Sequence, residues 1–170
     1  ARVHGELLMV SQSRRYFAAL AALRQEVAAL GALGAVVTEF YKEAHFPGFR
    51  EEMDHPLLVD MAIHQFDAAR LIIGGEPVAV YCEEHNPNWS WFRGAAGAHA
   101  VFEFEGGIRY VFTGSWVAPG HETAWNGQWR ISGERGTVLP MVANPTWRAI
   151  SSMTSISLVV SRRNVGMVTR

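Results

Sequence analysis

The chain has 170 residues, of which 49% are hydrophobic and 18% are charged, and its formal net charge is −1. The length fits one domain, or one domain with part of another, and the composition is typical of a globular protein. The balanced charge gives no reason to bind nucleic acid or an acidic membrane, and no apolar run is long enough to span a bilayer. The single cysteine, Cys82, excludes an intramolecular disulfide and a cysteine-rich zinc site, and we expect a cytoplasmic protein.

The first half of the chain predicts strands and helices in alternation. Short strands are expected over residues 6–11 and 35–41, where apolar and β-branched residues follow one another. A helix is expected over residues 13–30, because apolar side chains recur at spacings of three and four and a glycine follows. A second helix is expected to begin with Asp54 as its N-terminal cap and to run to about Ile73.

Beyond the second helix the pattern changes to short strands rich in aromatic residues. Four strands are expected, over residues 78–83, 99–104, 108–115 and 128–132. Two glycines, Gly106 and Gly107, predict a tight hairpin turn between the second and the third of them. This order of elements predicts an α+β fold, in which helices pack on one face of a mainly antiparallel sheet.

Asp60, His64 and Asp67 are the clearest chemical signal in the sequence. Their spacing places all three side chains on one face of the second helix. Carboxylates beside an imidazole stabilise its cation and fix its orientation, which suits a general acid or base near neutral pH. Two other interpretations stay open. The three groups are solvated on a helix surface, or Asp60 and His64 join His45 in the divalent-metal site of a hydrolase or isomerase.

Tryptophans form a second signal, since five of the six lie between residues 89 and 129. They are either core or subunit-interface residues, or the apolar wall of a pocket. In such a pocket, aromatic rings stack on the C–H faces of a sugar or polyol. In the second interpretation Trp91 contacts the substrate, beside asparagines and serines that supply hydrogen bonds.

Four stretches of the chain, taken together, resemble one known family. They are residues 8–16, residues 30–36, residues 57–67 with the pattern D-x-x-x-H-x-x-D, and residues 129–137 with the turn I-x-G-x-x-G. In this order they make residues 7–138 similar to the C-terminal domain of the Gfo/Idh/MocA family of NAD(P)-dependent oxidoreductases.

The resemblance implies three regions along the chain. Residues 1–13 would be the end of a Rossmann domain, including its last strand, and residues 14–138 the C-terminal α+β domain. Residues 139–170 would be a divergent tail, within a segment that holds four arginines and no acidic residue. The chain would then be a fragment of a longer enzyme.

The resemblance also implies a reaction and roles for individual side chains. Members of the family transfer a hydride between NAD or NADP and a sugar, an inositol or a similar polyol. Asp60 and His64 would be the catalytic residues, with His64 as the acid or base at the reacting hydroxyl and Asp60 orienting it. The substrate-binding residues would be Lys42, His45 and Asp67, together with Trp91 from the aromatic cluster.

Two features of the family are missing from this sequence: the glycine-rich dinucleotide fingerprint, and the Glu-Lys-Pro motif whose lysine transfers a proton. We therefore assign no cofactor-binding residue, expect no cofactor or metal on this chain, and expect it to be inactive alone. The alternative is a non-catalytic module that forms homodimers or binds a small molecule. In either case we expect a homo-oligomer that pairs through the open face of the sheet.

Overall fold

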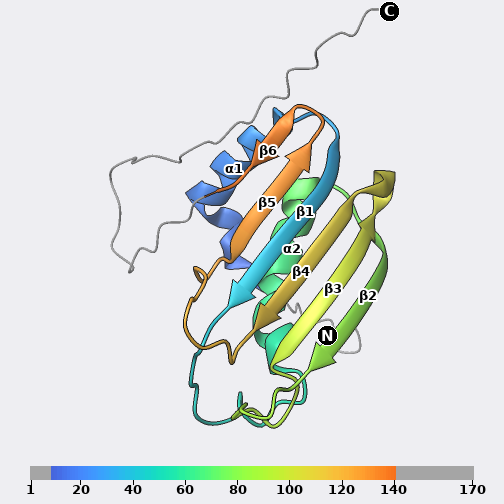
Figure 1. The fold of residues 1–170 in the computed structure, drawn as a ribbon. Coiled ribbons are helices and arrows are strands. Elements are labelled where there is room, and N and C mark those ends of the chain that lie inside the picture. The colour runs from blue at the N-terminus through green and yellow to red at the C-terminus, as the bar shows by residue number, and fades with distance from the viewer. Residues whose placement is uncertain (1–8, 141–170) are drawn as a thin grey trace, which may run out of the picture.

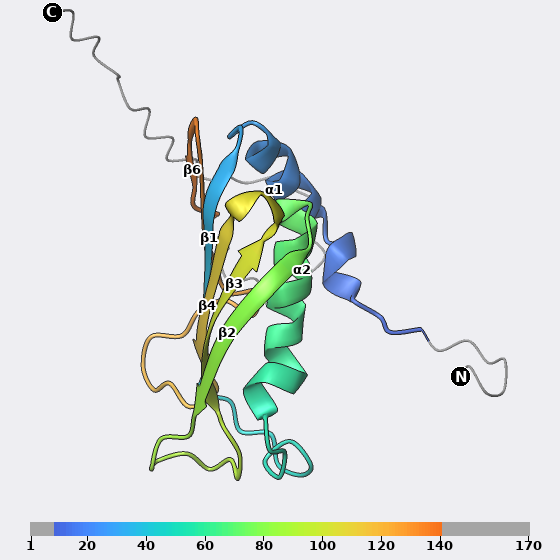
Figure 2. The same cartoon turned by 90° about the vertical axis from the view of Figure 1, so that its right-hand side faces the viewer.

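In the computed structural model, which describes residues 9–140, a six-stranded sheet carries helices on one of its faces (Figures 1 and 2). The helical elements are η1 (Ser13–Tyr16), α1 (Ala18–Ala28), η2 (Leu57–Ala62), α2 (Ile63–Ile73) and η3 (Glu105–Gly107). The strands are β1 (Leu33–Tyr41), β2 (Pro77–His85), β3 (Gly97–Phe104), β4 (Arg109–Ser115), β5 (Gln128–Gly133) and β6 (Gly136–Val138). No helix in this described part of the chain is long and apolar enough to span a membrane.

The strands follow the order β2–β3–β4–β1–β5–β6 across the sheet. Neighbouring strands pair antiparallel, except β1 and β4, which run parallel at the centre. Figures 1 and 2 show α1 and α2 on one face of the sheet, whereas no helix of residues 9–140 covers the other face. The predicted α+β fold is therefore confirmed. The strand β6 was not expected, because three residues are too few for a recognisable pattern.

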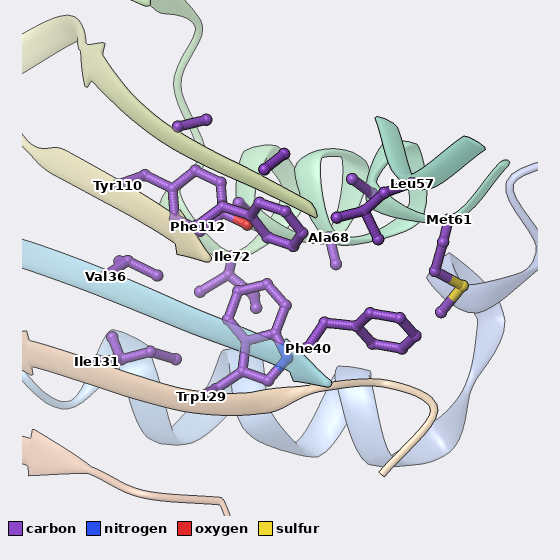
Figure 3. Packing of buried hydrophobic residues seen from close by; sticks show 14 of the residues in the cluster. Val36, Phe40, Leu57, Met61, Ala68, Ile72, Tyr110, Phe112, Trp129 and Ile131 are labelled. Atoms are coloured by element: carbon purple, nitrogen blue, oxygen red, sulfur yellow. The ribbon is translucent and has the colours of Figure 1, made fainter. Parts of the chain in front are cut away.

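Alternate residues of the central strands point toward the helices and form the core (Figure 3). The sheet contributes large side chains, namely Val36, Phe40, Tyr110, Phe112, Trp129 and Ile131. One side of η2 and α2 contributes Leu57, Met61, Ala68 and Ile72. Fully burying a side chain such as Leu, Ile or Phe stabilises the folded state by about 1.5–3 kcal/mol. This packing leaves the opposite side of α2 to polar residues.

The first predicted helix is divided in two. Phe17 has an extended backbone, with ψ 130°, and it separates the 3-10 turn η1 from α1. Tyr16 of η1 is 87% exposed, because η1 does not pack on the sheet, whereas α1 does, through Leu23 and Val27. The prediction of a strand over residues 6–11 is wrong for those of its residues that the structure describes. Residues 9–11 form no strand, and the earlier residues lie outside the described part of the chain.

The second helix also begins differently from the prediction. Asp54 does not cap it, because the Asp54 carboxylate accepts a hydrogen bond from Arg93 at 2.7 Å and the helix starts only after Pro56. Its first turn, η2, is a π-helix, and regular α-helix follows until Gly74, whose positive φ of 76° ends it. π-turns are rare and occur frequently at functional sites.

Candidate functional site

Loops from different parts of the chain meet at one end of the sheet, where β1 and β4 finish and η2 begins (Figure 1, bottom). The loop after β1 and the loop between β2 and β3 are joined by backbone hydrogen bonds, from Arg93 to Glu51 and from Ala95 to Asp54. Gly94 is required here, because a Cβ at this position would clash with the backbone carbonyl of Asp54. These contacts fix the loops around the start of the helix, which carries Asp60.

Asp60 lies in the π-turn η2 and is paired with an arginine. Its Oδ2 accepts a hydrogen bond from Nε of Arg50 at 2.8 Å, and the Arg50 guanidinium lies over the rings of Phe46 and Phe49. The side chain of Asp60 is 25% exposed. The ion pair holds the carboxylate in place and uses one of its oxygens, while no described residue donates to Oδ1.

His64 is the second residue of α2, and its Nδ1 lies 2.9 Å from Oε1 of Gln12. A carboxamide oxygen accepts hydrogen bonds, so Nδ1 carries the proton in this contact and Nε2 is left as an acceptor. Burial lowers the pKa of His64, and the charge of Arg14 lowers it further, while Asp60 and Asp67 act in the opposite direction. The ring is therefore mostly neutral at pH 7.

Asp67 forms an ion pair that uses both of its oxygens. They accept hydrogen bonds from Nε and the terminal nitrogen of Arg15, at 2.7 and 2.6 Å. Arg15 belongs to η1, which lies against the side of α2 that faces away from the sheet (Figure 2). The pair therefore ties η1 to α2 and occupies the oxygens that a substrate would need.

Lys42 directly follows β1 and is only 7% exposed. Its ammonium donates to Oε2 of Glu122 at 2.7 Å and lies 5.0 Å from the centre of the Trp125 ring. The hydrogen bond from Lys42, with a second from the backbone N–H of Glu43, holds the pKa of Glu122 below its ordinary value. This pair fixes the long loop between β4 and β5 against the end of β1.

Two aromatic rings connect Lys42 with the acidic side of the site. The ring of Phe46 lies 6.3 Å from that of Trp125, measured between their centres. The guanidinium of Arg50, which pairs with Asp60, also lies over the ring of Phe46. The ammonium of Lys42 lies over the ring of Trp125. The structure thus brings Asp60 and Lys42 to the same aromatic cluster, but no direct contact joins them within residues 9–140.

His45 and Trp91 form a separate pair. Their rings are stacked, with centres 3.7 Å apart and planes inclined by 17°. His45 is exposed, Trp91 is half-buried, and the buried Nε1 of Trp91 has no hydrogen-bond partner among the described residues. The exposed ring of His45 offers a flat aromatic surface that suits the C–H face of a sugar, whereas the buried Nε1 of Trp91 is out of reach of a ligand.

The tryptophan cluster expected from the sequence divides between the core and this end of the molecule. Trp116 and Trp129 are buried in the core, as the first interpretation predicts. Trp89 and Trp125 are 64% and 45% exposed. They and Trp91 belong to the loops around the start of η2, where the second interpretation stays a prediction.

No metal site is formed by the part of the chain that the structure describes. Within it, no group of three or more His, Cys, Asp or Glu is arranged to hold a metal ion. His45, His64 and Asp60 have separate partners, so the divalent-metal interpretation has no geometric basis here. Gly31 lies between a helix and the following strand, the reverse of the strand-to-helix turn that binds a dinucleotide phosphate. Gly31 is therefore not part of such a phosphate-binding turn.

Three side chains at this site were missed by the sequence analysis: Gln12, Arg14 and Arg50. Gln12 contacts His64 from 52 positions earlier in the chain, and Arg50 reaches Asp60 from a loop. No periodicity connects such positions. The sequence shows only that Arg14 and Arg15 are adjacent, which does not reveal what either side chain contacts.

Comparison with known proteins gives three findings. A family model, the GFO/IDH/MocA C-terminal domain, matches residues 20–139. The chain is also similar to the uncharacterized protein y4oX of Sinorhizobium fredii (strain NBRC 101917 / NGR234). The identity is 29% over 92 residues, which are 54% of this chain and 26% of that protein.

Solved structures supply the third finding. The aldose-aldose oxidoreductase from Caulobacter crescentus complexed with glycerol has a TM-score of 0.66 at 23% identity, over 82% of this chain and 42% of that one. An oxidoreductase from Agrobacterium radiobacter in complex with NAD+, L-tartaric acid and magnesium has a TM-score of 0.69 at 21% identity, over 78% and 40%. This likeness shows a shared fold. The chain spans about two fifths of the length of these structures and about a quarter of y4oX.

Proposed function

The chain belongs to the Gfo/Idh/MocA family, whose C-terminal domain it carries over residues 20–139, and on this premise we propose that it forms the substrate-binding half of an NAD(P)-dependent oxidoreductase. The substrate would carry a hydroxyl group, as in a sugar, an inositol or a similar polyol. Structures with this fold contain glycerol in one case and L-tartaric acid in another, both small hydroxylated compounds. The observation that carries the proposal is that His64, whose pKa the charge of Asp60 influences, is mostly neutral and has Nε2 left to accept a proton.

His64 has the properties of a proton acceptor. Oxidation of a hydroxyl-bearing carbon releases one proton from oxygen and one hydride from carbon, so the site needs a base. The hydrogen bond to Gln12 leaves Nε2 as an acceptor, and the lowered pKa keeps the ring neutral at pH 7. In the reducing direction the protonated imidazole would return the proton to the carbonyl oxygen.

Asp60 is a positioning residue in this proposal. Its carboxylate opposes the effect of burial on the pKa of His64, and Arg50 fixes its orientation. Lys42 and Asp67 are engaged in their own ion pairs, so we assign them to holding the loops and η1 in place. Of the four expected substrate-binding residues, we therefore keep only His45 and Trp91 in that role.

The hydride partner would be NAD or NADP, held by the Rossmann domain of a whole enzyme. The contribution of the described residues would be to bind the substrate and to move its proton. We expect residues 1–170 by themselves to leave NAD(P) unreduced with any polyol.

Titration of the protein with myo-inositol, D-glucose and glycerol, followed by NMR, tests the proposal. At least one of these compounds should shift the signals of His64, and its affinity should fall about tenfold or more in Asp60→Asn and His64→Asn. The matched control is Asp54→Asn, which removes an exposed acid at the same end of the molecule and should leave the affinity unchanged. Failure of all three compounds to bind, or an equal loss in the control, contradicts the proposal.

The face of the sheet opposite the helices supports a second proposal. Val37, Val111, Val101 and Tyr81 lie side by side across four strands, and Tyr81 is 67% exposed. We propose that this apolar row pairs with a second copy of the chain. Light scattering should then give the mass of a dimer, and Val101→Lys that of a monomer. The control is Val59→Lys, at an exposed position in η2. A monomer at high protein concentration rules this pairing out.

A further inference from the structure

Arg14 differs from its neighbours around α2 in having no acidic partner. The adjacent Arg15 pairs with Asp67, and Arg50 pairs with Asp60. In contrast, no Asp or Glu oxygen within residues 9–140 lies at ion-pair distance from Arg14.

Uncharged groups hold the guanidinium of Arg14 in place. One terminal nitrogen donates to the Trp125 carbonyl oxygen at 3.1 Å, and the other contacts Sδ of Met61 at 3.4 Å. The carboxamide of Gln65, turned so that both its polar atoms are satisfied, accepts from the first nitrogen at 3.2 Å. A guanidinium has five N–H groups. These contacts therefore position the cation but leave its charge unbalanced and some of its donors unused.

The missing acidic partner of Arg14 is significant because this arginine is partly withdrawn from water. Arg14 is half-buried, and burial lowers its pKa to about 10. Arg24 of α1 also has no ion pair within residues 9–140, but its side chain is exposed. A buried charge is ordinarily paired, because removing it from water costs free energy that an opposite charge offsets.

Arg14 acts on the residue at the centre of the proposed site. Gln12 and Arg14 come from one short segment, and Gln12 binds Nδ1 of His64 directly. The positive charge of Arg14 is close enough to lower the pKa of His64. An anion bound to Arg14 would therefore lie beside the imidazole that receives the proton of the substrate.

We propose that Arg14 binds an oxyanion of the substrate, a carboxylate or a phosphate, so that the substrate is a sugar acid or a sugar phosphate. This inference rests on the proposed function and narrows its substrate class. A planar guanidinium with unused N–H groups matches the oxygens of either anion in geometry as well as in charge. Because the site is partly withdrawn from water, the attraction between the two charges is stronger than on an open surface.

Three sugars that differ only at C6 test the proposal: D-glucose with a hydroxyl, D-glucuronate with a carboxylate, and D-glucose 6-phosphate. Calorimetry on the whole chain should give an affinity for at least one charged sugar about tenfold higher than for glucose. The tighter of the two identifies the anion. Arg14→Gln should abolish the preference, and Arg24→Gln, which removes one exposed positive charge, should preserve it.

Other outcomes overturn the inference in distinguishable ways. If glucose binds in a manner that needs His64 and the charged sugars bind no better, the proposal that Arg14 binds an oxyanion is wrong and the proposed function stands. If none of these sugars binds, and myo-inositol and glycerol do not bind either, both the oxyanion site and the proposed function fail. If Arg14→Gln lowers stability but keeps the preference, Arg14 is structural. If Arg14→Gln weakens binding of NAD and leaves sugar binding unchanged, the anion belongs to the cofactor.

The histidine itself supplies an independent readout. A bound anion offsets the positive charge of Arg14, so it should raise the pKa of His64, measured from its NMR titration. The other charges that act on His64, those of Asp60 and Asp67, are unchanged by the ligand. Glucose should have no such effect, and Arg14→Gln should raise the pKa without any ligand. An unchanged titration with D-glucuronate and with D-glucose 6-phosphate contradicts the proposal.

Discussion

The two ends of the continuous helix formed by η2 and α2 differ in geometry and in partners. The C-terminal part is regular α-helix, packs Ala68, Ala69 and Ile72 against the sheet, and ends at Gly74. The N-terminal part begins with a π-turn, in which Asp60 pairs with Arg50 of the loop after β1, and continues with His64, which contacts Gln12 just before η1.

Both parts bury apolar side chains, Leu57 and Met61 in η2 and Ala69 and Ile72 in α2. The polar contacts of the proposed site, in contrast, gather at the N-terminal part, around Asp60 and His64. Substitutions at the two ends should therefore have different consequences, and four measurements test this difference.

The largest effect is expected at Ile72, and Ile63 on the same helix is its comparison. Ile72 is 6% exposed and Ile63 is 38% exposed. Ile72→Ala should lower the free energy of unfolding by about 2–5 kcal/mol, because it removes buried methyl groups and leaves a cavity. Ile63→Ala should cost less than about 1 kcal/mol. Urea denaturation measures both, and equal losses would remove the distinction between the two ends.

The next effect concerns the glycines near each end. Gly94→Ala should destabilise the protein by about 1–3 kcal/mol, since the new Cβ meets the backbone carbonyls of Met53 and Asp54, which cannot move as a side chain can. Gly75→Ala, just after the C-terminal end, finds only the Glu105 side chain at 3.7 Å and should be tolerated. Thermal unfolding compares the two variants, and a stable Gly94→Ala would show that the loops are not fixed.

A smaller effect should appear as a dependence of stability on pH. The pKa of His64 is lowered on folding from an ordinary value of 6.5, so the unfolded chain binds this proton more readily than the folded protein. Stability should therefore fall as the pH drops from 7 through 6.5 and should level off below the folded pKa. His64→Asn should flatten this slope, whereas His121→Asn, at an exposed loop position, should keep it.

The smallest effect is expected at Asp67. Its pair with Arg15 is partly exposed, so Asp67→Asn should cost only about 0.2–1 kcal/mol. Arg15→Gln should cost the same, and the double variant little more. Affinity for the best sugar should be unchanged in all three, because Asp67 is engaged by Arg15. A clear loss of affinity in Asp67→Asn alone would return this residue to substrate binding.

The sequence predicted the fold better than it predicted the site. Repeating apolar positions were sufficient for α2 and for the strands β1 to β5, because each pattern is local and repeated. The break at Phe17 and the π-turn of η2 were missed, since both depend on packing against distant segments.

For the site, only features within one helix could be predicted. Asp60 and His64 share a face because of their spacing, and that much follows from helix geometry. Their partners Gln12, Arg14 and Arg50 come from other segments, so the electrostatic state of His64 and the unbalanced charge of Arg14 required the folded chain.

The central position of β1 has a consequence for synthesis of the protein. Val36 in β1 pairs with Tyr110 of β4 on one side and with Ile131 of β5 on the other. The ribosome makes β1 before the other strands of this sheet, yet both of its neighbours emerge only near the end of the described domain. The apolar side chains of β1 must therefore stay unpaired while β2 and β3 are made, which favours slow, late closure of the sheet and dependence on chaperones.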